Sequence, residues 1–243
     1  MNESNKSEGK LFKVWLNPLQ LIDVDEPWAK LSEKDLKPED LIKFLCTPGI
    51  ECDEKGLIQR YREISQEKKR LFAAPAEERI LEKLVWPLRH AKASYMVGNY
   101  LGTISLSGMV SEMVAMLFFE MSDLSLNNRP MNNNDEKALF GSPFEKLGQH
   151  RRVEVLHAFN IIDDDTKADF DLIRSTRRKY LHLWSQDHES IPKDAANSYY
   201  AAVSIVVKAI GQDIRDGMLL INPKLVKYLE RSGTYNPEEN STE

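Results

Sequence analysis

The segment LGTISLSGMVSEMVAMLFFEMSD, residues 101–123, is the most apolar part of the sequence and decides its fold class. Its large apolar residues recur at i, i+3 and i+4 spacing, the pattern of a helix that buries one face. These residues are Leu106, Met109, Val110, Met113, Leu117 and Met121. Because Glu112 and Glu120 interrupt it, the segment falls short of the roughly 18 to 20 consecutive apolar residues that cross a membrane. We therefore expect a central core helix and no membrane association.

Helical periodicity continues on both sides of this segment, whereas signals for strands are scarce. Capping residues and apolar spacing predict further helices at 38–46, 54–72, 143–159, 164–184, 193–211 and 222–230. Pro75 marks a break, after which the helical pattern resumes with an expected kink at Pro87. The asparagine-rich segment 124–136 has no periodicity and is expected to be a loop or a partly disordered insertion.

These elements predict an all-α protein built on an up-and-down helical bundle from residue 76 to residue 230. Residues 1–75 are expected to form an N-terminal helical extension, whose role the sequence does not indicate. The polar residues 231–243 are expected to form a frayed tail.

The overall charge narrows the range of partners. The chain has 243 residues and a formal net charge of −5, so no global positive field attracts nucleic acid. Any such binding must come from a local basic patch.

The polar N-terminus lacks an apolar leader, which predicts a cytoplasmic protein. Cys46 and Cys52 do not have a recurrent zinc or redox spacing and are expected to be reduced structural thiols.

Histidines and acidic residues do not form a recognisable metal motif. His150 and His157 lie close to one helical face, but no acid or cysteine completes a set of ligands at a suitable spacing. The acidic run at 163–165 is better explained as the start of a helix. We therefore expect neither a metal nor a cofactor.

An arginine interrupts the apolar stripe of the helix that contains FDLIRSTRRKYLHLW, residues 170–184. A helical projection places Arg177 in the middle of this stripe. The stripe consists of Phe170, Ile173, Tyr180, Leu181 and Trp184. A guanidinium cannot lose its proton, so burial without a partner would cost several kcal/mol. The stripe must therefore open onto a polar cleft, or an acid must pair with the arginine.

Glu112, on the apolar core helix, is the candidate for a buried acid partner. Ser105 and Gly108 lie beside it on the helix and give a small polar track. We expect Glu112 to contact Arg177, or Arg174 instead. The alternative is that Arg177 extends from the edge of the bundle and pairs with an acid for packing alone.

The arginine and the following histidine resemble the signature of the HEPN superfamily (higher eukaryotes and prokaryotes nucleotide-binding). In that family an arginine precedes a histidine by four to six residues near the end of a late helix in a short bundle. Arg177 and His182 here give the form R-x4-H. The helix order of residues 80–212 is also similar, because YMVGNYLGTISLSGMVSEMV resembles the first long family helix with its glutamate.

The resemblance implies a metal-independent ribonuclease in which a 2′-hydroxyl attacks the adjacent phosphate. His182 would be the general acid or base, and Arg177 would hold the phosphate. Arg174, Arg178 and Lys179 would contribute RNA or phosphate contacts. The resemblance further implies a homodimer in which two motifs share one cleft, and a defence or toxin role with an antitoxin or another protein as partner.

Two other interpretations remain open. Many members of the family are thought to be non-catalytic, which makes an RNA-binding or protein-interaction module the main alternative. The motif could also have arisen by chance in an unrelated helical scaffold, and Arg177 would then only anchor the bundle.

Overall fold

The computed structural model describes residues 54–65, 81–181, 189–211, 213–215 and 218–231. The chain divides into two compact units, Met1–Cys52 and Asp53–Glu243, and all the described residues belong to the second unit. The helix predicted at 38–46, the two cysteines, the break at Pro75 and the expected tail from residue 232 lie outside the described residues.

The fold of the described residues is all-α, with two short hairpins as its only strands. A five-residue turn of π-helix lies at Leu81–Val85 (η4), and a three-residue turn of 3-10 helix lies at Phe144–Lys146 (η5). The α-helices are α2 (Glu54–Ile64), α4 (Trp86–Met96), α5 (Tyr100–Ser122), α6 (Asn133–Phe140), α7 (Gln149–Ala158), α8 (Asp164–Tyr180), α9 (Ile191–Ile210) and α10 (Pro223–Arg231). The antiparallel hairpins pair β1 (Ser125–Leu126) with β2 (Arg129–Pro130), and β3 (Asp213–Arg215) with β4 (Met218–Leu220).

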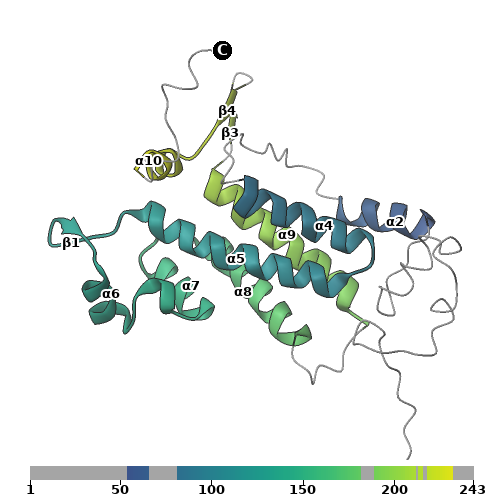
Figure 1. Cartoon of the computed structure of the whole chain (residues 1–243), viewed down its shortest axis with the longest axis horizontal. Coiled ribbons are helices and arrows are strands. Elements are labelled where there is room, and N and C mark those ends of the chain that lie inside the picture. Colours follow the sequence, from purple (N-terminus) through teal and green to yellow (C-terminus); the bar gives the residue numbers. More distant parts are fainter. Residues whose placement is uncertain (1–53, 66–80, 182–188, 212, 216–217, 232–243) are drawn as a thin grey trace, which may run out of the picture. The chain divides into compact units, whose positions relative to one another are not determined.

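Four long helices, α4, α5, α8 and α9, form the centre of this unit (Figure 1). Helix α5 packs against the other three, and it lies alongside α9 over much of its length. Apolar side chains from all four helices fill the core between them; its fully buried members include Ile104, Val110, Val114, Phe170, Ile173, Ile205 and Ile210. The predicted all-α fold class is therefore confirmed.

Helix α5 has the predicted extent, and Val110 and Met121 of its expected core face are buried, at 0% and 5% exposed. Asn99 caps its N-terminus by accepting a hydrogen bond from the Gly102 amide at 2.9 Å. Its buried positions also include small polar residues, among them Thr103, Ser107 and Ser111. Met109, which we expected in the core, is 42% exposed. The small side chains at the buried positions leave room for the helices that pack against α5.

Helix α5 is also the one described helix that is long and apolar enough to cross a membrane. The expectation of no membrane association stays a prediction, because length and composition alone do not decide it. Half of the apolar window is buried inside the structure. A core helix passes the same test, so the apolar character of α5 is explained by its packing against α4, α8 and α9.

The asparagine-rich segment, expected to be a loop or a partly disordered insertion, forms a short hairpin and the start of α6. Asn127 and Asn128 both adopt positive φ angles, 53° and 61°, and form the tight turn between β1 and β2. Asn132 then caps α6 in a capping box with Asp135. Asparagine tolerates the left-handed conformation and caps helices well, so the same composition that suggests disorder here builds a turn and a helix start.

Two predicted helix starts also differ. The helix expected from residue 143 begins at Gln149, after the 3-10 turn Phe144–Lys146. Pro87, where we expected a kink, lies in the first turn of α4, where its missing N–H costs little. The π-helical turn Leu81–Val85 precedes it.

Helix α2 belongs to the same unit as the bundle, although our expected boundary at residue 75 assigned it to the N-terminal extension. Ile64 is 1% exposed and lies in the core. Arg60 is 7% exposed, and its Nε donates to the carbonyl of Met96 at 2.6 Å. Arg60 therefore caps the C-terminal end of α4, where the helix dipole favours a cation.

Candidate functional site

Arg177 lies near the C-terminal end of α8 and pairs with Glu112 in the middle of α5. Its Nη1 donates to Glu112 Oε1 across 65 residues of sequence. The aliphatic part of the arginine lies over Gly108, since a Cβ at that position would be 2.8 Å from Arg177 Cδ. The absence of a side chain at Gly108 therefore lets the arginine lie flat along α5 and reach Glu112 one turn further on.

The pair is at the surface, so the expectation that Glu112 is a buried partner is wrong. The side chains of Arg177 and Glu112 are 46% and 44% exposed. Phe170, Ile173 and Tyr180 are buried as the helical projection predicts. Arg177 shares their side of α8 but lies where that side meets solvent beside α5. This geometry matches the alternative in which the stem packs and the head group reaches outward.

Arg174 pairs within its own helix instead of with Glu112. Its Nη2 lies 3.1 Å from Asp171 Oδ1, one turn earlier on α8. Its Nε is buried and, among the described residues, has no hydrogen-bond partner. The Arg174 head group is therefore only partly satisfied by protein.

Lys179 and Tyr180 converge on Asp194, in the first turn of α9. Lys179 Nζ lies 3.1 Å from Asp194 Oδ2, and the Tyr180 hydroxyl donates to the same oxygen at 2.7 Å. Burial and the neighbouring carboxylate raise the pKa of Tyr180, although Lys179 opposes the shift. Sequence reasoning did not identify Asp194, whose only signal is an acid in the first turn of a helix.

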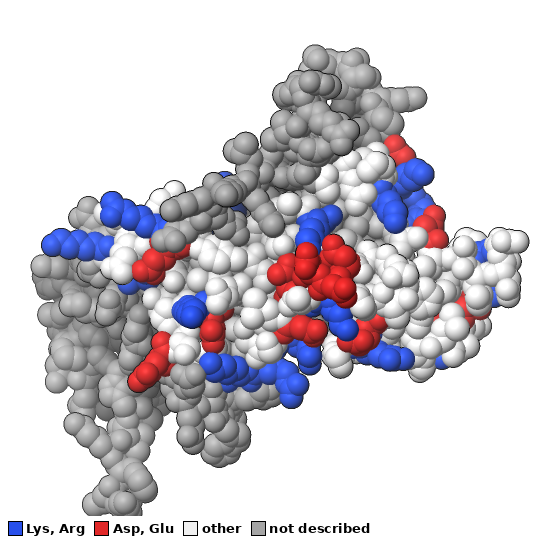
Figure 2. Space-filling view, turned by 180° about the vertical axis from the view of Figure 1, so that it is seen from behind, with Lys and Arg blue, Asp and Glu red and all other residues white. Residues whose placement is uncertain are grey.

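Arg178 is exposed, and it is the one cation of this turn that makes no ion pair with the described residues. Its three neighbouring cations each face a carboxylate, so the cluster formed by Arg174, Arg177, Arg178 and Lys179 carries little excess positive charge. On the face shown in Figure 2, Lys and Arg side chains are interspersed with Asp and Glu and form no continuous basic surface. Phosphate binding here would rest on a few defined groups, without a broad basic surface to support it.

His182 lies outside the described residues, as does Trp184. The structure describes α8 to Tyr180 and its C-cap at Leu181, compared with the predicted end at residue 184. The arginine half of the R-x4-H motif therefore has a described environment, and the histidine half keeps only its position in the sequence.

The remaining histidine candidates each lie beside a carboxylate at the surface. His157 Nε2 lies 2.8 Å from Asp164 Oδ1, and His150 Nδ1 lies 4.0 Å from Glu154 Oε1. Lys167 also pairs with Glu154, at 2.9 Å, and this hydrogen bond lowers the Glu154 pKa. In the described part of the chain, no group of three His, Cys, Asp or Glu residues could hold a metal ion.

Comparison with known proteins does not add a family to these observations. No protein-family model matches the sequence, and no curated protein and no solved structure resembles it significantly.

Proposed function

We propose that the chain is a HEPN-like protein that cleaves RNA without a metal ion, with Arg177 as its phosphate clamp. One observation carries the proposal: a guanidinium at the last turn of α8 is fixed by Glu112, remains 46% exposed, and precedes a histidine by five residues. Phosphate-directed acid–base chemistry requires at least a fixed, accessible guanidinium and a side chain that can transfer a proton, which histidines do with an ordinary pKa near neutral.

The guanidinium of Arg177 has further N–H donors that a phosphate could use. A guanidinium offers five N–H groups, and the hydrogen bond to Glu112 uses only one terminal nitrogen. Glu112 holds the head group on one side, so less freedom is lost when a phosphate binds on the other. The negative charge of Glu112 opposes an incoming phosphate, and it thereby limits affinity.

The proposed reaction is transfer of a phosphodiester within RNA. The 2′-hydroxyl oxygen attacks the adjacent phosphorus, the bond to the 5′-oxygen of the next nucleotide breaks, and a 2′,3′-cyclic phosphate forms. The 2′-hydroxyl loses its proton and the leaving oxygen gains one. His182 is assigned one of these transfers, and Arg177 stabilises charge on the non-bridging oxygens. Arg174, Arg178 and Lys179 are assigned contacts with neighbouring phosphates.

In this proposal the protein is a cytoplasmic homodimer whose two copies of Arg177 face one cleft. A defence or toxin role, held in check by an antitoxin or another protein, fits an RNA-cleaving domain of this kind. Two facing sites would place the basic residues of both copies around one RNA, which adds to the small excess positive charge of a single copy.

A non-catalytic HEPN-like module for binding RNA or protein is the second candidate. It is favoured by the pairing of Arg174, Arg177 and Lys179 with carboxylates, since these contacts also serve a purely structural purpose.

Cleavage of a mixed RNA substrate by the full chain in EDTA tests the proposal. Wild type is expected to produce cyclic-phosphate ends, and His182→Ala to lose about 10² to 10⁴ in rate. Arg177→Met is expected to lose activity too, although its unbranched side chain can still pack over Gly108. His150→Ala is the matched control, because the side chain of that histidine is 60% exposed and lies 4.0 Å from Glu154.

Thermal unfolding of each variant shows whether the fold is intact. If folded wild type cleaves none of a varied set of RNAs but still binds them, the non-catalytic module is favoured. If His150→Ala reduces cleavage as much as His182→Ala, the assignment of His182 is wrong.

A further inference from the structure

A cavity of about 330 Å³ lies between the C-terminal part of α5, the segment before α8, the last turns of α9 and the start of α10. This volume is at the lower end of the range for small-molecule pockets. Its wall includes Thr166 on α8. Since α8 rises about 1.5 Å per residue, the cavity lies about 16 Å along that helix from Arg177. It is therefore separate from the proposed RNA site.

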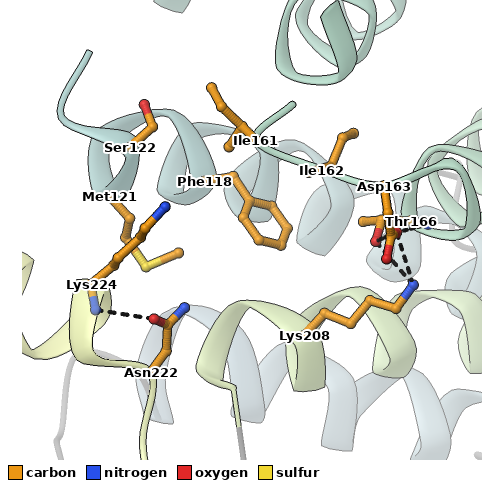
Figure 3. Close-up of a pocket in the computed structure, with 10 residues that line it drawn as sticks. All are labelled: Phe118, Met121, Ser122, Ile161, Ile162, Asp163, Thr166, Lys208, Asn222 and Lys224. Atoms are coloured by element: carbon orange, nitrogen blue, oxygen red, sulfur yellow. Dashed lines mark hydrogen bonds and ion pairs between the residues drawn. The ribbon is translucent and has the colours of Figure 1, made fainter. Parts of the chain in front are cut away.

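The inner wall of this cavity is apolar. Phe118 and Met121 come from successive turns of α5 and are 8% and 5% exposed. Ile161 and Ile162 form another wall, in the segment before α8. Figure 3 shows the ring of Phe118 between these isoleucines and the residues of α9 and α10. A compact hydrocarbon body would find contacts on two sides of the cavity.

Two lysines give the cavity its positive charge, and they differ in how well they are paired. Lys208 Nζ donates to the Thr166 hydroxyl at 2.9 Å and lies 3.4 Å from Asp163. Hydrogen bonds from Thr166 keep the pKa of Asp163 low, so this carboxylate offsets Lys208. Lys224 has no ion-pair partner among the described residues. Figure 3 shows its side chain extending from α10 toward α5, away from the Lys208 group.

The wall that carries Lys224 is anchored at both ends of α10. The backbone N–H of Asn222 donates to the carbonyl of Ile210 at 2.8 Å, and the Asn222 side-chain amide donates to the carbonyl of Ala209 at 3.2 Å. At the other end, Arg231 bonds to Asp123 at 2.6 Å and to the Glu120 carbonyl at 3.0 Å. The cation is therefore carried on a fixed helix, as a preorganised ligand site requires.

We infer that this cavity binds a small organic anion with an apolar body, such as a medium-chain carboxylic acid. The hydrocarbon part lies on Phe118 and Met121, and the anionic group meets Lys224. The polar group formed by Lys208, Thr166 and Asp163 closes the opposite end, where Asp163 repels a second anionic group. The inference does not depend on RNA cleavage.

Methyl NMR of the full chain, labelled at its methionines, tests this site with octanoate as the probe. The Met121 signal is expected to shift saturably, while the signal of Met109, which is 42% exposed on α5, stays in place. Lys224→Gln is expected to weaken octanoate binding about tenfold, the loss of one charge-assisted hydrogen bond. Lys227→Gln is the matched control, since Lys227 is exposed on the same helix and does not line the cavity.

1-Octanol and octylammonium, which match the chain length without the negative charge, are expected to bind at least about tenfold more weakly than octanoate. The inference is overturned if Met121 does not respond, if octanol binds as tightly as octanoate, or if Lys227→Gln has the effect of Lys224→Gln. Because Lys224 is exposed, its replacement is expected to leave the thermal unfolding midpoint unchanged.

Discussion

The side chain of Arg177 occupies the space that a side chain at Gly108 would need, because a Cβ built at Gly108 would lie 2.8 Å from Arg177 Cδ. The two residues are therefore coupled, although the arginine forms its ion pair with Glu112. This contact explains why a glycine is placed in the middle of the longest helix of the core, where it weakens the helix by about 1 kcal/mol relative to alanine.

The coupling predicts that the effect of Gly108→Ala depends on residue 177. When Arg177→Ala is already present, Gly108→Ala should stabilise the protein by about 0.5 to 1 kcal/mol through helix propensity. With Arg177 in place, the new methyl group displaces the arginine stem, and the gain should be smaller or reversed. Urea unfolding of the four proteins measures this difference. Equal gains in both backgrounds would mean that the arginine does not lie over Gly108 in solution.

The ion pair between Arg177 and Glu112 is expected to contribute little to stability. Because both side chains are nearly half exposed, we expect a coupling energy of about 0.5 kcal/mol. A double-mutant cycle of Glu112→Gln and Arg177→Met, followed by urea unfolding, measures it, and the coupling should fall in high salt. A coupling above about 3 kcal/mol would instead indicate a buried structural pair.

The capping box of α6 predicts a dependence of stability on acid. The hydrogen bond from Arg129, together with one from the Asn132 amide, lowers the pKa of Asp135 to about 2. An unfolded aspartate titrates near 3.9, so the stabilisation is fully present above that pH and is lost as the pH falls toward 2. Asp135→Asn should therefore show a shallower loss of the unfolding midpoint between about pH 4 and pH 2. An unchanged slope would argue against the box.

The buried contact of Arg60 predicts that this cation contributes to the attachment of α2 to α4, together with the hydrogen bond between Tyr95 and Glu63. Arg60→Ala leaves the Met96 carbonyl without this donor and should cost about 1 to 3 kcal/mol. Amide hydrogen exchange should rise chiefly in residues 54–64. Arg62→Ala is the control, because Arg62 is exposed on the same helix. Equal exchange in both variants would show that the contact does not hold α2.

The sequence allows the helices to be predicted where apolar periodicity contrasts with polar residues and where caps are explicit. Helix α8 illustrates this, since Asp163 caps it and Phe170 and Ile173 are buried as projected. The contact between Arg177 and Glu112 could be predicted because a cation in an apolar stripe needs an acid. The solvent exposure of this pair could not be predicted, because it depends on how far α5 covers the apolar stripe of α8 in three dimensions.

The features that sequence reasoning missed involve small polar residues with two structural uses. Asn127 and Asn128 suggest disorder by composition but form a turn because asparagine adopts positive φ readily. Ser107 and Ser111 carry no apolar signal, yet they lie on the most buried face of α5. Arg60 lies in a highly charged segment that suggests a solvent-exposed helix face. Only its position beside the end of α4 shows that it is a buried cap.

The close packing along α5 and α9 has a consequence for engineering. The hydroxyls of Ser107 and Ser198 are fully buried and have no hydrogen-bond partner among the described residues. An unsatisfied buried hydroxyl costs about 1 to 3 kcal/mol, whereas alanine fits the same space without that cost. Ser107→Ala and Ser198→Ala are therefore expected to stabilise the protein. Because both residues are buried, the surface that contacts other molecules would be unchanged.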